Sequence, residues 1–325
     1  MGLPNVGNQG RFRLSTDFVF DGGIHVNRSP LGRDFYVMTS AQQAKLKGDL
    51  RSRSFTTVNA AFNACEANRG DKIFVAEGYT ETVHVADQWS NNKAGVRVIG
   101  LGTGTNRPKF TWDATAATIL LSAANIVVEN CQFEMAGDPA ATAALTVAKG
   151  IGLAGAGCGL VGNHFQCGVD ADQLMTLGVL VNASKCFIVG NKFIGDPAAP
   201  ITAAGTVIRL TAADQFEMFD NYLSAGLATV TDGLVETLTT ASLDINIQRN
   251  YFRANTATDT CAVDFGAALA CTGHLNFNQM VVGVDATATT VIFTVSGTCN
   301  LDLGPNNYAV NDNNQFGIVI GTTSA

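Results

Sequence analysis

The 325-residue chain is poor in charged and in aromatic residues, which make up 14% and 8% of it. No apolar run approaches the ~18 residues that a membrane-spanning helix needs, so we expect no membrane partner. No basic segment followed by an apolar one opens the chain, so we expect no secretory signal.

The pattern of cysteine and histidine also excludes several kinds of site. None of the eight cysteines forms a CxxC pair, and the four histidines form neither HxH nor HExxH. The sequence therefore predicts no metal centre and no cofactor. Cys131, Cys158 and Cys186 occupy recurring positions of a repeat, where we expect small buried side chains rather than disulfides. That expectation favours synthesis in a reducing cytoplasm.

The repeat is a six-residue fragment that occurs seven times between residues 119 and 309. Its final residues are separated by 28 to 32 positions and are Phe133, Phe165, Phe193, Leu223, Phe252, Met280 and Tyr308. A fixed period in this range indicates stacked supersecondary units.

The columns of the repeat indicate strands separated by a bend. In each repeat, the residues five and seven positions before the final residue of the fragment are mostly apolar. Residues two apart share one face of a strand. A second apolar segment precedes each fragment, at 118–121, 150–153, 178–181, 206–210, 234–238, 262–265 and 291–295. The position two before the final residue of the fragment is Cys131 in the first repeat. In the other six repeats it is an asparagine: Asn163, Asn191, Asn221, Asn250, Asn278 and Asn306. Asparagine tolerates the left-handed backbone that a sharp bend requires, and stacked asparagines form hydrogen-bonded ladders.

These columns resemble the right-handed parallel β-helix of the pectate-lyase-like superfamily, with its asparagine ladder and stacked aromatic residues. The resemblance covers roughly residues 50–310. It implies an all-β solenoid. It implies little about function, because this fold carries lyases, hydrolases, phage tailspikes and structural proteins.

The sequence predicts two parts. Residues 1–53 lack the repeat and form an extended N-terminal arm, and residues 54–325 form the parallel β-helix. Within the second part, the apolar spacing over 55–69 predicts an amphipathic helix that covers the open end of the solenoid. Ser54 or Thr56 could cap it, and Gly70 ends it. Complete repeats follow at about 96–310, and a closing strand is expected beyond residue 310.

Charge is divided unevenly between these two parts. The arm holds eight basic and four acidic residues, a net +4, whereas the remainder holds 12 basic and 23 acidic residues, a net −11. Such a division is typical of a docking arm on a self-repelling body. The candidate partner-binding residues of the arm are Arg11, Arg13, Phe18, Phe20, Arg28 and Arg33. A solvated loop is the simpler interpretation.

Candidate catalytic residues are few. The acidic residues of the repeat loops are Asp138, Asp170, Asp172, Asp196, Asp232, Asp259 and Asp285, and their neighbours Pro, Gly and Ala also suit ordinary turns. The spacing places none of Arg209, Arg249 and Arg253 in an acidic cluster. Most aromatic residues fall in inward columns, with Tyr222, Tyr251 and Trp112 as candidates for sugar contact. We therefore expect no catalytic residues.

Fold, charge and the missing motifs together favour a non-enzymatic structural virion protein of a bacteriophage. The resemblance implies a homotrimer, here a capsid decoration or cement protein whose arm binds the major capsid protein or another virion protein. The −11 charge of the body disfavours nucleic acid. The alternative is a tailspike-like adsorption protein that binds or depolymerises a host polysaccharide. A free polysaccharide lyase is a further alternative.

Overall fold

The computed structural model describes most of the solenoid and part of the arm. The described residues are 11–14, 18–21, 32–90, 92–135, 145–166, 168–170, 173–175, 177–195, 206–225, 233–237, 240–254, 263–265, 270–282, 293–296, 299–304, 307–311, 316–317 and 320–323.

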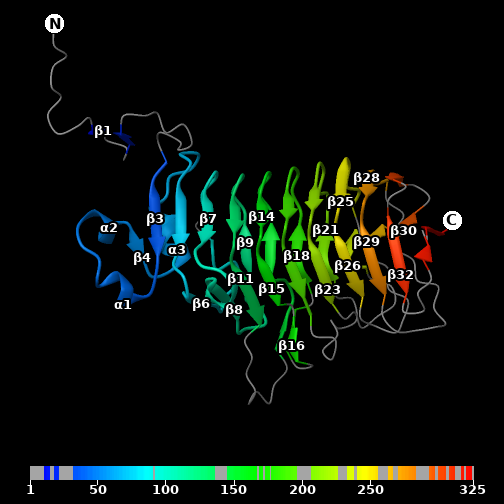
Figure 1. Cartoon of the computed structure of the whole chain (residues 1–325), viewed down its shortest axis with the longest axis horizontal. Coiled ribbons are helices and arrows are strands. Elements are labelled where there is room, and N and C mark those ends of the chain that lie inside the picture. Colours follow the sequence, from blue (N-terminus) through cyan, green and yellow to red (C-terminus); the bar gives the residue numbers. More distant parts are fainter. Residues whose placement is uncertain are drawn as a thin grey trace, which may run out of the picture.

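The described chain is a parallel β-solenoid with three long sheets (Figure 1). We name each sheet after one of its strands. The β14 sheet has 11 strands: β3 (Asp34–Val37), β4 (Ser54–Phe55), β5 (Lys72–Val75), β7 (Arg97–Gly100), β10 (Val127–Glu129), β14 (Gly159–Val161), β19 (Phe187–Val189), β22 (Glu217–Phe219), β25 (Ile245–Gln248), β28 (Thr272–Asn276) and β31 (Asn300–Leu303).

The other two long sheets follow the same stacking. The β15 sheet has 10 strands: β6 (Thr80–Val83), β8 (Lys109–Trp112), β11 (Gln132–Met135), β15 (His164–Gln166), β20 (Lys192–Ile194), β23 (Tyr222–Ala225), β26 (Tyr251–Ala254), β29 (Gln279–Val282), β32 (Tyr308–Asn311) and β33 (Phe316–Gly317). The β18 sheet has 8 strands: β9 (Ile119–Leu121), β13 (Ile151–Leu153), β18 (Leu177–Val181), β21 (Thr206–Leu210), β24 (Val235–Thr237), β27 (Val263–Phe265), β30 (Phe293–Ser296) and β34 (Ile320–Thr323).

Each repeat contributes one strand to each long sheet, in the order β18 sheet, β14 sheet, β15 sheet. Strands one repeat apart pair in parallel, as Val128 with Leu160 and Phe133 with Phe165. The seven apolar segments that precede the fragments are the strands β9 to β30 of the β18 sheet. The predicted all-β parallel solenoid is therefore confirmed.

The remaining elements are short. A hairpin joins β1 (Arg11–Leu14) and β2 (Phe18–Asp21), and a small sheet contains β12 (Leu145–Val147), β16 (Gly168–Asp170) and β17 (Gln173–Met175). The helices are α1 (Ser40–Gln43), α2 (Asp49–Ser52), α3 (Val58–Ala64) and the 3₁₀ turn η1 (Gly104–Asn106). Among the described residues, no helix is long and apolar enough to cross a membrane.

The solenoid begins earlier than the predicted boundary at residue 53. Strand β3 pairs in parallel with β5 and with β4, so Asp34–Val37 belong to the β14 sheet rather than to the arm. The predicted helix over 55–69 is shortened to α3, because the chain turns away at Cys65. Its N-cap is Thr57, whose Oγ1 accepts a hydrogen bond from the Ala60 N–H at 3.2 Å.

Helix α3 packs its apolar side into the N-terminal end of the solenoid. Val58, Ala61 and Phe62 are fully buried, and the Phe62 ring lies 6.1 Å from the ring of Trp89. The helix contacts β3, β4 and β5. At the other end, β34 pairs in parallel with β30, and β33 pairs antiparallel with β32.

The last repeat is one residue longer than the sequence pattern suggests. Met280 pairs with Ala309, and Gln279 pairs with Tyr308. The pattern took the aromatic Tyr308 as the core position, and a slip of one residue exchanges the two faces of a strand. The ladder residue of this repeat is accordingly Asn307, and Asn306 lies outside the described residues.

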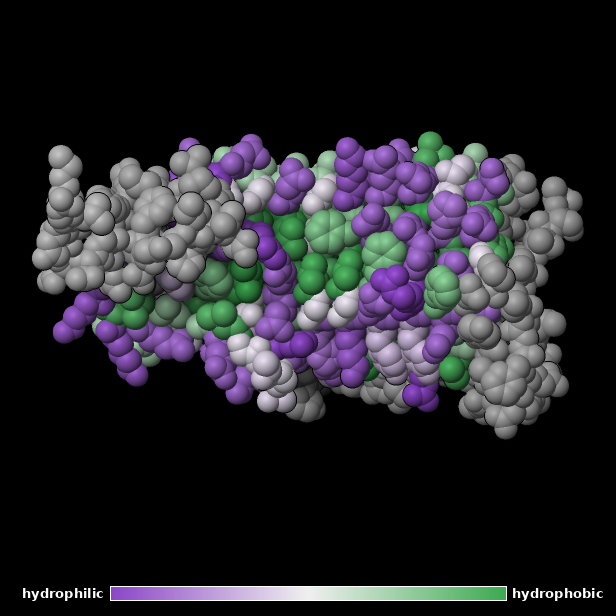
Figure 2. Space-filling model, turned by 45° about the horizontal axis from the view of Figure 1, so that its top comes forward, coloured by the Kyte–Doolittle hydropathy of each residue, from purple (hydrophilic) through white to green (hydrophobic). Residues whose placement is uncertain are grey.

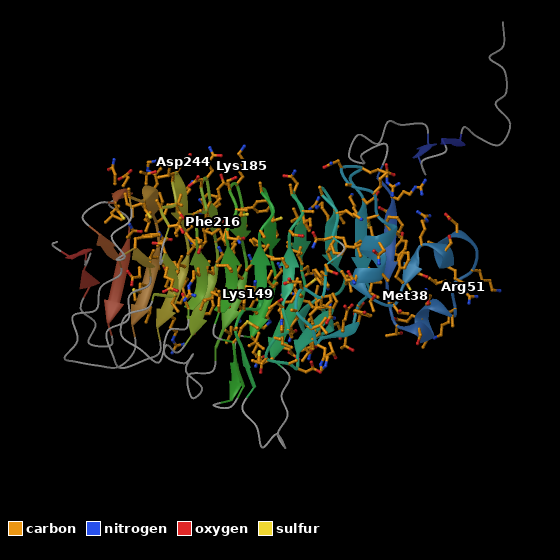
Figure 3. The ribbon with its side chains drawn as sticks, turned by 180° about the vertical axis from the view of Figure 1, so that it is seen from behind. Met38, Arg51, Lys149, Lys185, Phe216 and Asp244 are labelled. Atoms are coloured by element: carbon orange, nitrogen blue, oxygen red, sulfur yellow. The ribbon has the colours of Figure 1, made fainter. Side chains whose placement is uncertain are left out.

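Left-handed residues lie at two of the three corners of each turn. At the corner between the β14 and β15 sheets they are Asn130, Gly162, Gly190, Asp220, Arg249 and Phe277, each one residue before the ladder position. The described ladder asparagines themselves are not left-handed, so their role is hydrogen bonding and not the bend. A second row precedes the β14 sheet, and two of its members, Lys185 and Asp244, lie along the same edge of the solenoid (Figure 3).

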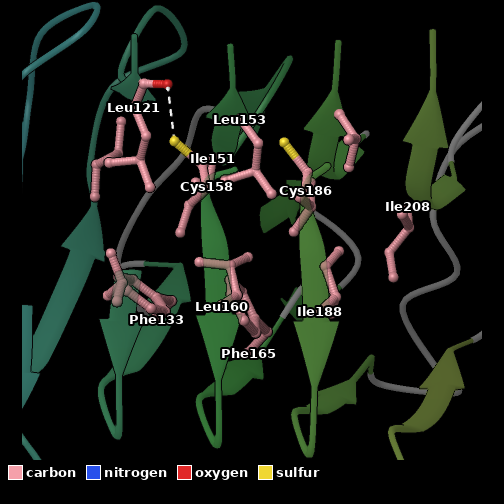
Figure 4. Packing of buried hydrophobic residues seen from close by; sticks show 14 of the residues in the cluster. Leu121, Phe133, Ile151, Leu153, Cys158, Leu160, Phe165, Cys186, Ile188 and Ile208 are labelled. Atoms are coloured by element: carbon pink, nitrogen blue, oxygen red, sulfur yellow. Dashed lines mark hydrogen bonds between the residues drawn. The ribbon is translucent and has the colours of Figure 1, made fainter. Parts of the chain in front are cut away.

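The core consists of columns of identical or similar side chains. Phe110, Phe133, Phe165 and Phe193 stack on one another with ring centroids 5.5, 4.9 and 4.4 Å apart. Cys131, Cys158 and Cys186 are fully buried and free of disulfides, as predicted. Figure 4 shows Cys158 and Cys186 beside aliphatic residues, with the Cys158 thiol directed at the Leu121 carbonyl, 3.8 Å away.

Asparagine side chains connect consecutive turns at the corner between the β14 and β15 sheets. The Asn221 Oδ1 accepts from the Asn191 N–H at 2.8 Å, and its Nδ2 donates to the Ile188 carbonyl at 2.8 Å. The same Nδ2 lies 2.9 Å from the Asn250 Oδ1. The contact repeats along Asn163, Asn191, Asn221, Asn250, Asn278 and Asn307.

Replacing one ladder residue should destabilise the solenoid. Asn221→Ala leaves the buried N–H of Asn191 and the carbonyl of Ile188 without their partner, and each unsatisfied group costs about 1–3 kcal/mol. We expect the free energy of unfolding in urea to fall by about 3 kcal/mol. Asn246→Ala, on the outer side of β25, is the matched control and should change it by less than about 0.5 kcal/mol. Equal losses in both variants would contradict this role.

Candidate functional site

The candidate residues of the arm fall in different places. Arg11 and Arg13 lie in β1 and Phe18 and Phe20 in β2, where Phe12 pairs with Phe20 and Arg13 with Val19. Arg28 lies outside the described residues. Arg33 is exposed at the start of the β14 sheet. The structure therefore does not bring these six residues into one described site.

Asp71 fixes the junction between the arm and the solenoid. Its side chain is fully buried and accepts hydrogen bonds from the backbone N–H groups of Arg33 and Glu66, both at 2.8 Å. The Arg69 guanidinium donates to both carboxylate oxygens, at 2.7 and 2.6 Å. Burial opposes ionisation of Asp71, but these hydrogen bonds outweigh it and hold its pKa below the usual value.

Opposite charges one repeat apart form pairs across neighbouring strands. Arg209 contacts Glu236 at 2.5 Å, and Arg249 contacts Asp220 at 2.8 Å. Arg97 pairs with Glu129 in the same way. Arg209 and Arg249 thus each pair with a single carboxylate one repeat away, a contact that the sequence analysis did not predict. The signal that could have found these pairs is the repeat period itself, because residues about 28 positions apart are neighbours in a sheet.

One pair belongs to a short polar column on the outside of the β18 sheet. Arg209 pairs in register with Glu236, and Glu236 with Asp264. Glu236 is 1% exposed, although it lies on the outer side. Glu236 and Asp264 lie on adjacent strands, whose backbones are about 4.8 Å apart, and glycosidases use a pair of neighbouring carboxyl groups. Neither Glu236 nor Asp264 is among the candidate residues predicted from the sequence.

The two tyrosines proposed for sugar contact form a stack on the outer side of the β15 sheet. The rings of Tyr222 and Tyr251 lie 5.0 Å apart at 5°, and the Lys192 ammonium lies 5.6 Å from the Tyr222 ring centre. The faces of the two tyrosine rings are turned toward each other and toward Lys192, so mainly the ring edges remain accessible to a ligand. Sugars, in contrast, stack on open ring faces. Trp112, the third candidate, is fully buried.

The outer side of the β14 sheet carries a row of apolar side chains among the described residues. We call it the β14 face. Two columns of outward residues compose it, and their apolar members are Tyr36, Phe74, Ile99, Val127, Val161, Phe187, Val189 and Phe219. All eight are half-buried. Figure 2 shows a hydrophobic band along the middle of one side of the solenoid, with hydrophilic rows above and below it.

The centre of the β14 face is closely packed. Gly159 lies under the ring of Phe187, and a Cβ at Gly159 would overlap that ring. Beside Phe219 the guanidinium carbon of Arg249 lies 5.3 Å from the ring centre. Apolar side chains on the outer side of a sheet mark a candidate site of interaction.

Histidines and loop carboxylates do not converge in the described part of the chain. The His84 Nδ1 lies 2.7 Å from Asp113, and the His274 Nδ1 lies 3.1 Å from Asp302. Of the acidic loop residues named above, only Asp170 lies within the described residues. Those residues contain no group of three His, Cys, Asp or Glu side chains that could hold a metal ion.

Comparison of the chain with protein-family models, with curated proteins and with solved structures finds no match.

The buried carboxylate of Asp71 makes a prediction about stability and pH. Asp71→Asn removes the charge that Arg69 requires, and breaking a buried pair costs about 3 kcal/mol. A depressed carboxyl pKa stabilises the fold above the unfolded pKa of about 3.9 and loses that effect as pH falls through the folded value. We therefore expect the difference from the wild type in urea unfolding to be full at pH 7 and to shrink below about pH 4.

Asp113→Asn is the control, because Asp113 is partly exposed and pairs with an exposed histidine. A difference between Asp71→Asn and the wild type that stays constant from pH 7 to pH 3 would contradict the ionic role of Asp71.

Proposed function

We propose that the protein is a non-enzymatic structural component of a bacteriophage virion. The observation that carries the proposal is the β14 face, an apolar surface on a rigid solenoid that suits packing against another protein. The charge division supports it as well: residues 1–33, which precede β3, hold four basic and two acidic residues, a net +2, against a net −9 for the rest of the chain. In this proposal the arm binds the capsid or another virion protein, and the body projects as a decoration.

The Asp71 junction supports an anchoring role for the arm. Hydrogen bonds from Arg33 and Arg69 tie the first described residues of the body to a buried carboxylate. A pull on the arm would therefore be transmitted to the β14 sheet. The homotrimer that the resemblance implies would hold three such arms at one end of a parallel bundle.

The experiment is gold-antibody labelling of phage particles, with the intact chain and with a variant that lacks residues 1–31. The deletion stops before β3, so the variant should keep the urea unfolding midpoint of the intact chain. We expect label over the heads with the intact chain and no label with the variant. Particles without label in both cases, or full attachment of the variant, would contradict the proposal.

A second candidate function has one specific observation in its favour. The column of Arg209, Glu236 and Asp264 places two carboxylates on adjacent strands, which suits a tailspike-like protein that depolymerises a host polysaccharide. Label confined to phage tails would favour this candidate.

The second candidate predicts that the protein releases reducing ends from host polysaccharide. Glu236→Gln and Asp264→Asn should then each lower that release by at least about 100-fold, the usual contribution of an acid–base group. Glu217→Gln, an exposed carboxylate on the β14 face, is the control and should leave the rate unchanged. Equal release by all three variants would exclude this column as the site.

A further inference from the structure

Arg107 differs from the other described arginines between residues 69 and 249. A carboxylate contacts each of Arg69, Arg97, Arg209 and Arg249. The side chain of Arg107 is half-buried, and among the described residues it contacts no carboxylate and its Nε has no hydrogen-bond partner. Burying a guanidinium nitrogen without an acceptor costs free energy. An anion bound at Arg107 would supply the missing acceptor.

Two further cationic side chains lie close to Arg107 on the outer side of the β15 sheet. Lys109, two residues after Arg107, is a member of an outward column of that sheet. The column continues through Gln132, His164 and Lys192 on the next three strands. Among the described residues, neither His164 nor Lys192 is in an ion pair. Adjacent strands are about 4.8 Å apart, so these two side chains can contact the same ion.

The corner beside these side chains is bare for two turns. Gly162 and Gly190 occupy the corner there, each two residues before a member of the cationic column. A Cβ at Gly162 would meet no atom of a described residue within 4 Å, and one at Gly190 would meet only the Gly162 N, at 4.0 Å. The next residue of the row, Asp220, is already held in an ion pair. An ion can therefore approach His164 and Lys192 across this corner.

The electrostatics of His164 show a region of positive potential at this place. Burial of the ring lowers the pKa of His164, and the positive charges of Lys192 and Arg107 lower it further. Glu134 opposes this effect, but its carboxylate already contacts the Lys109 ammonium at 2.9 Å. The solenoid is acidic as a whole, so a local excess of unpaired positive charge stands out and attracts anions.

We propose that Arg107, His164 and Lys192 form a binding site for a doubly charged oxyanion, a sulfate or phosphate group. This site does not depend on the virion proposal. The guanidinium offers a fork of N–H donors that matches two oxygens of such a group, and the ammonium adds a point charge. Donors on three different strands or corners suit the three accessible oxygens of a tetrahedral group better than the two oxygens of a carboxylate.

Binding should strengthen as the pH falls. A bound anion favours the imidazolium form of His164 and so raises its pKa. By linkage, the protonated site binds the anion more tightly than the neutral one. Below the pKa of His164 the site holds three positive charges, and above it only those of Arg107 and Lys192 remain.

The test follows the histidine ring signals of the full chain in a two-dimensional proton–carbon NMR spectrum while sulfate replaces chloride at constant ionic strength. We expect the His164 signals, assigned with His164→Gln, to shift and saturate at millimolar sulfate. The half-saturating concentration should be several-fold lower at about pH 5.5 than at about pH 8. His84 and His274, which contact Asp113 and Asp302, are internal controls and should not shift.

Charge-removing variants test the other two side chains. Arg107→Gln and Lys192→Gln should each raise the half-saturating sulfate concentration at least about tenfold, because each loses a charge-assisted hydrogen bond. Neither should lower the urea unfolding midpoint, since Lys192 is exposed and the Arg107 Nε has no partner in the described chain. Arg97→Gln removes the same charge from the β14 sheet and is the matched control, which should bind sulfate as the wild type does.

Glycerol phosphate distinguishes the sources of the anion. Binding as tight as that of sulfate would identify a phosphate group carried by a larger molecule, whereas binding at least about tenfold weaker would identify a free ion. Three results would overturn the proposal: no saturable shift of His164, equal shifts of His84 and His274, or sulfate binding by Arg107→Gln as tight as that of the wild type.

Discussion

Hydrogen bonding between consecutive turns is the constraint on which the rest of the structure depends. Each strand is only three to five residues long in most of the solenoid, so no turn is stable without its neighbours. The asparagine ladder extends this bonding through a corner where the backbone ladder is interrupted. Asn191 and Asn221 satisfy buried backbone groups there, because an unsatisfied group inside the core would cost more than the bond itself contributes.

Stacking at a fixed register explains which parts of the fold the sequence predicts. A residue such as Phe165 must match Phe133 and Phe193 above and below it, so the inward columns repeat visibly in the sequence. The ends are less predictable because they break the repeat. Strand β3 has no motif of its own, and its place in the β14 sheet depends on pairing with Lys72–Val75.

Outward positions are free of this constraint, which is why the candidate sites were harder to predict. The pair of Arg209 and Glu236 becomes visible only when the repeat period is used to align charges. The apolar members of the β14 face differ in type from strand to strand and leave no motif. The prediction for Trp112 was wrong in the opposite direction, because a residue expected to contact a ligand lies in the core. Its residue type suggested a ligand contact, but its register places the side chain inside the solenoid.

Because stacking does not constrain outward positions, the apolar residues of the β14 face are not explained by the fold. The inward side of the sheet needs Val128, Leu160 and Ile188 for stability, but folding does not require apolar residues such as Val161 and Phe187 on the outward side. Exposed apolar groups there increase the risk of unwanted association between solenoids. The charged residues Arg97, Glu129 and Glu217 on the same face reduce that risk by interrupting the apolar surface.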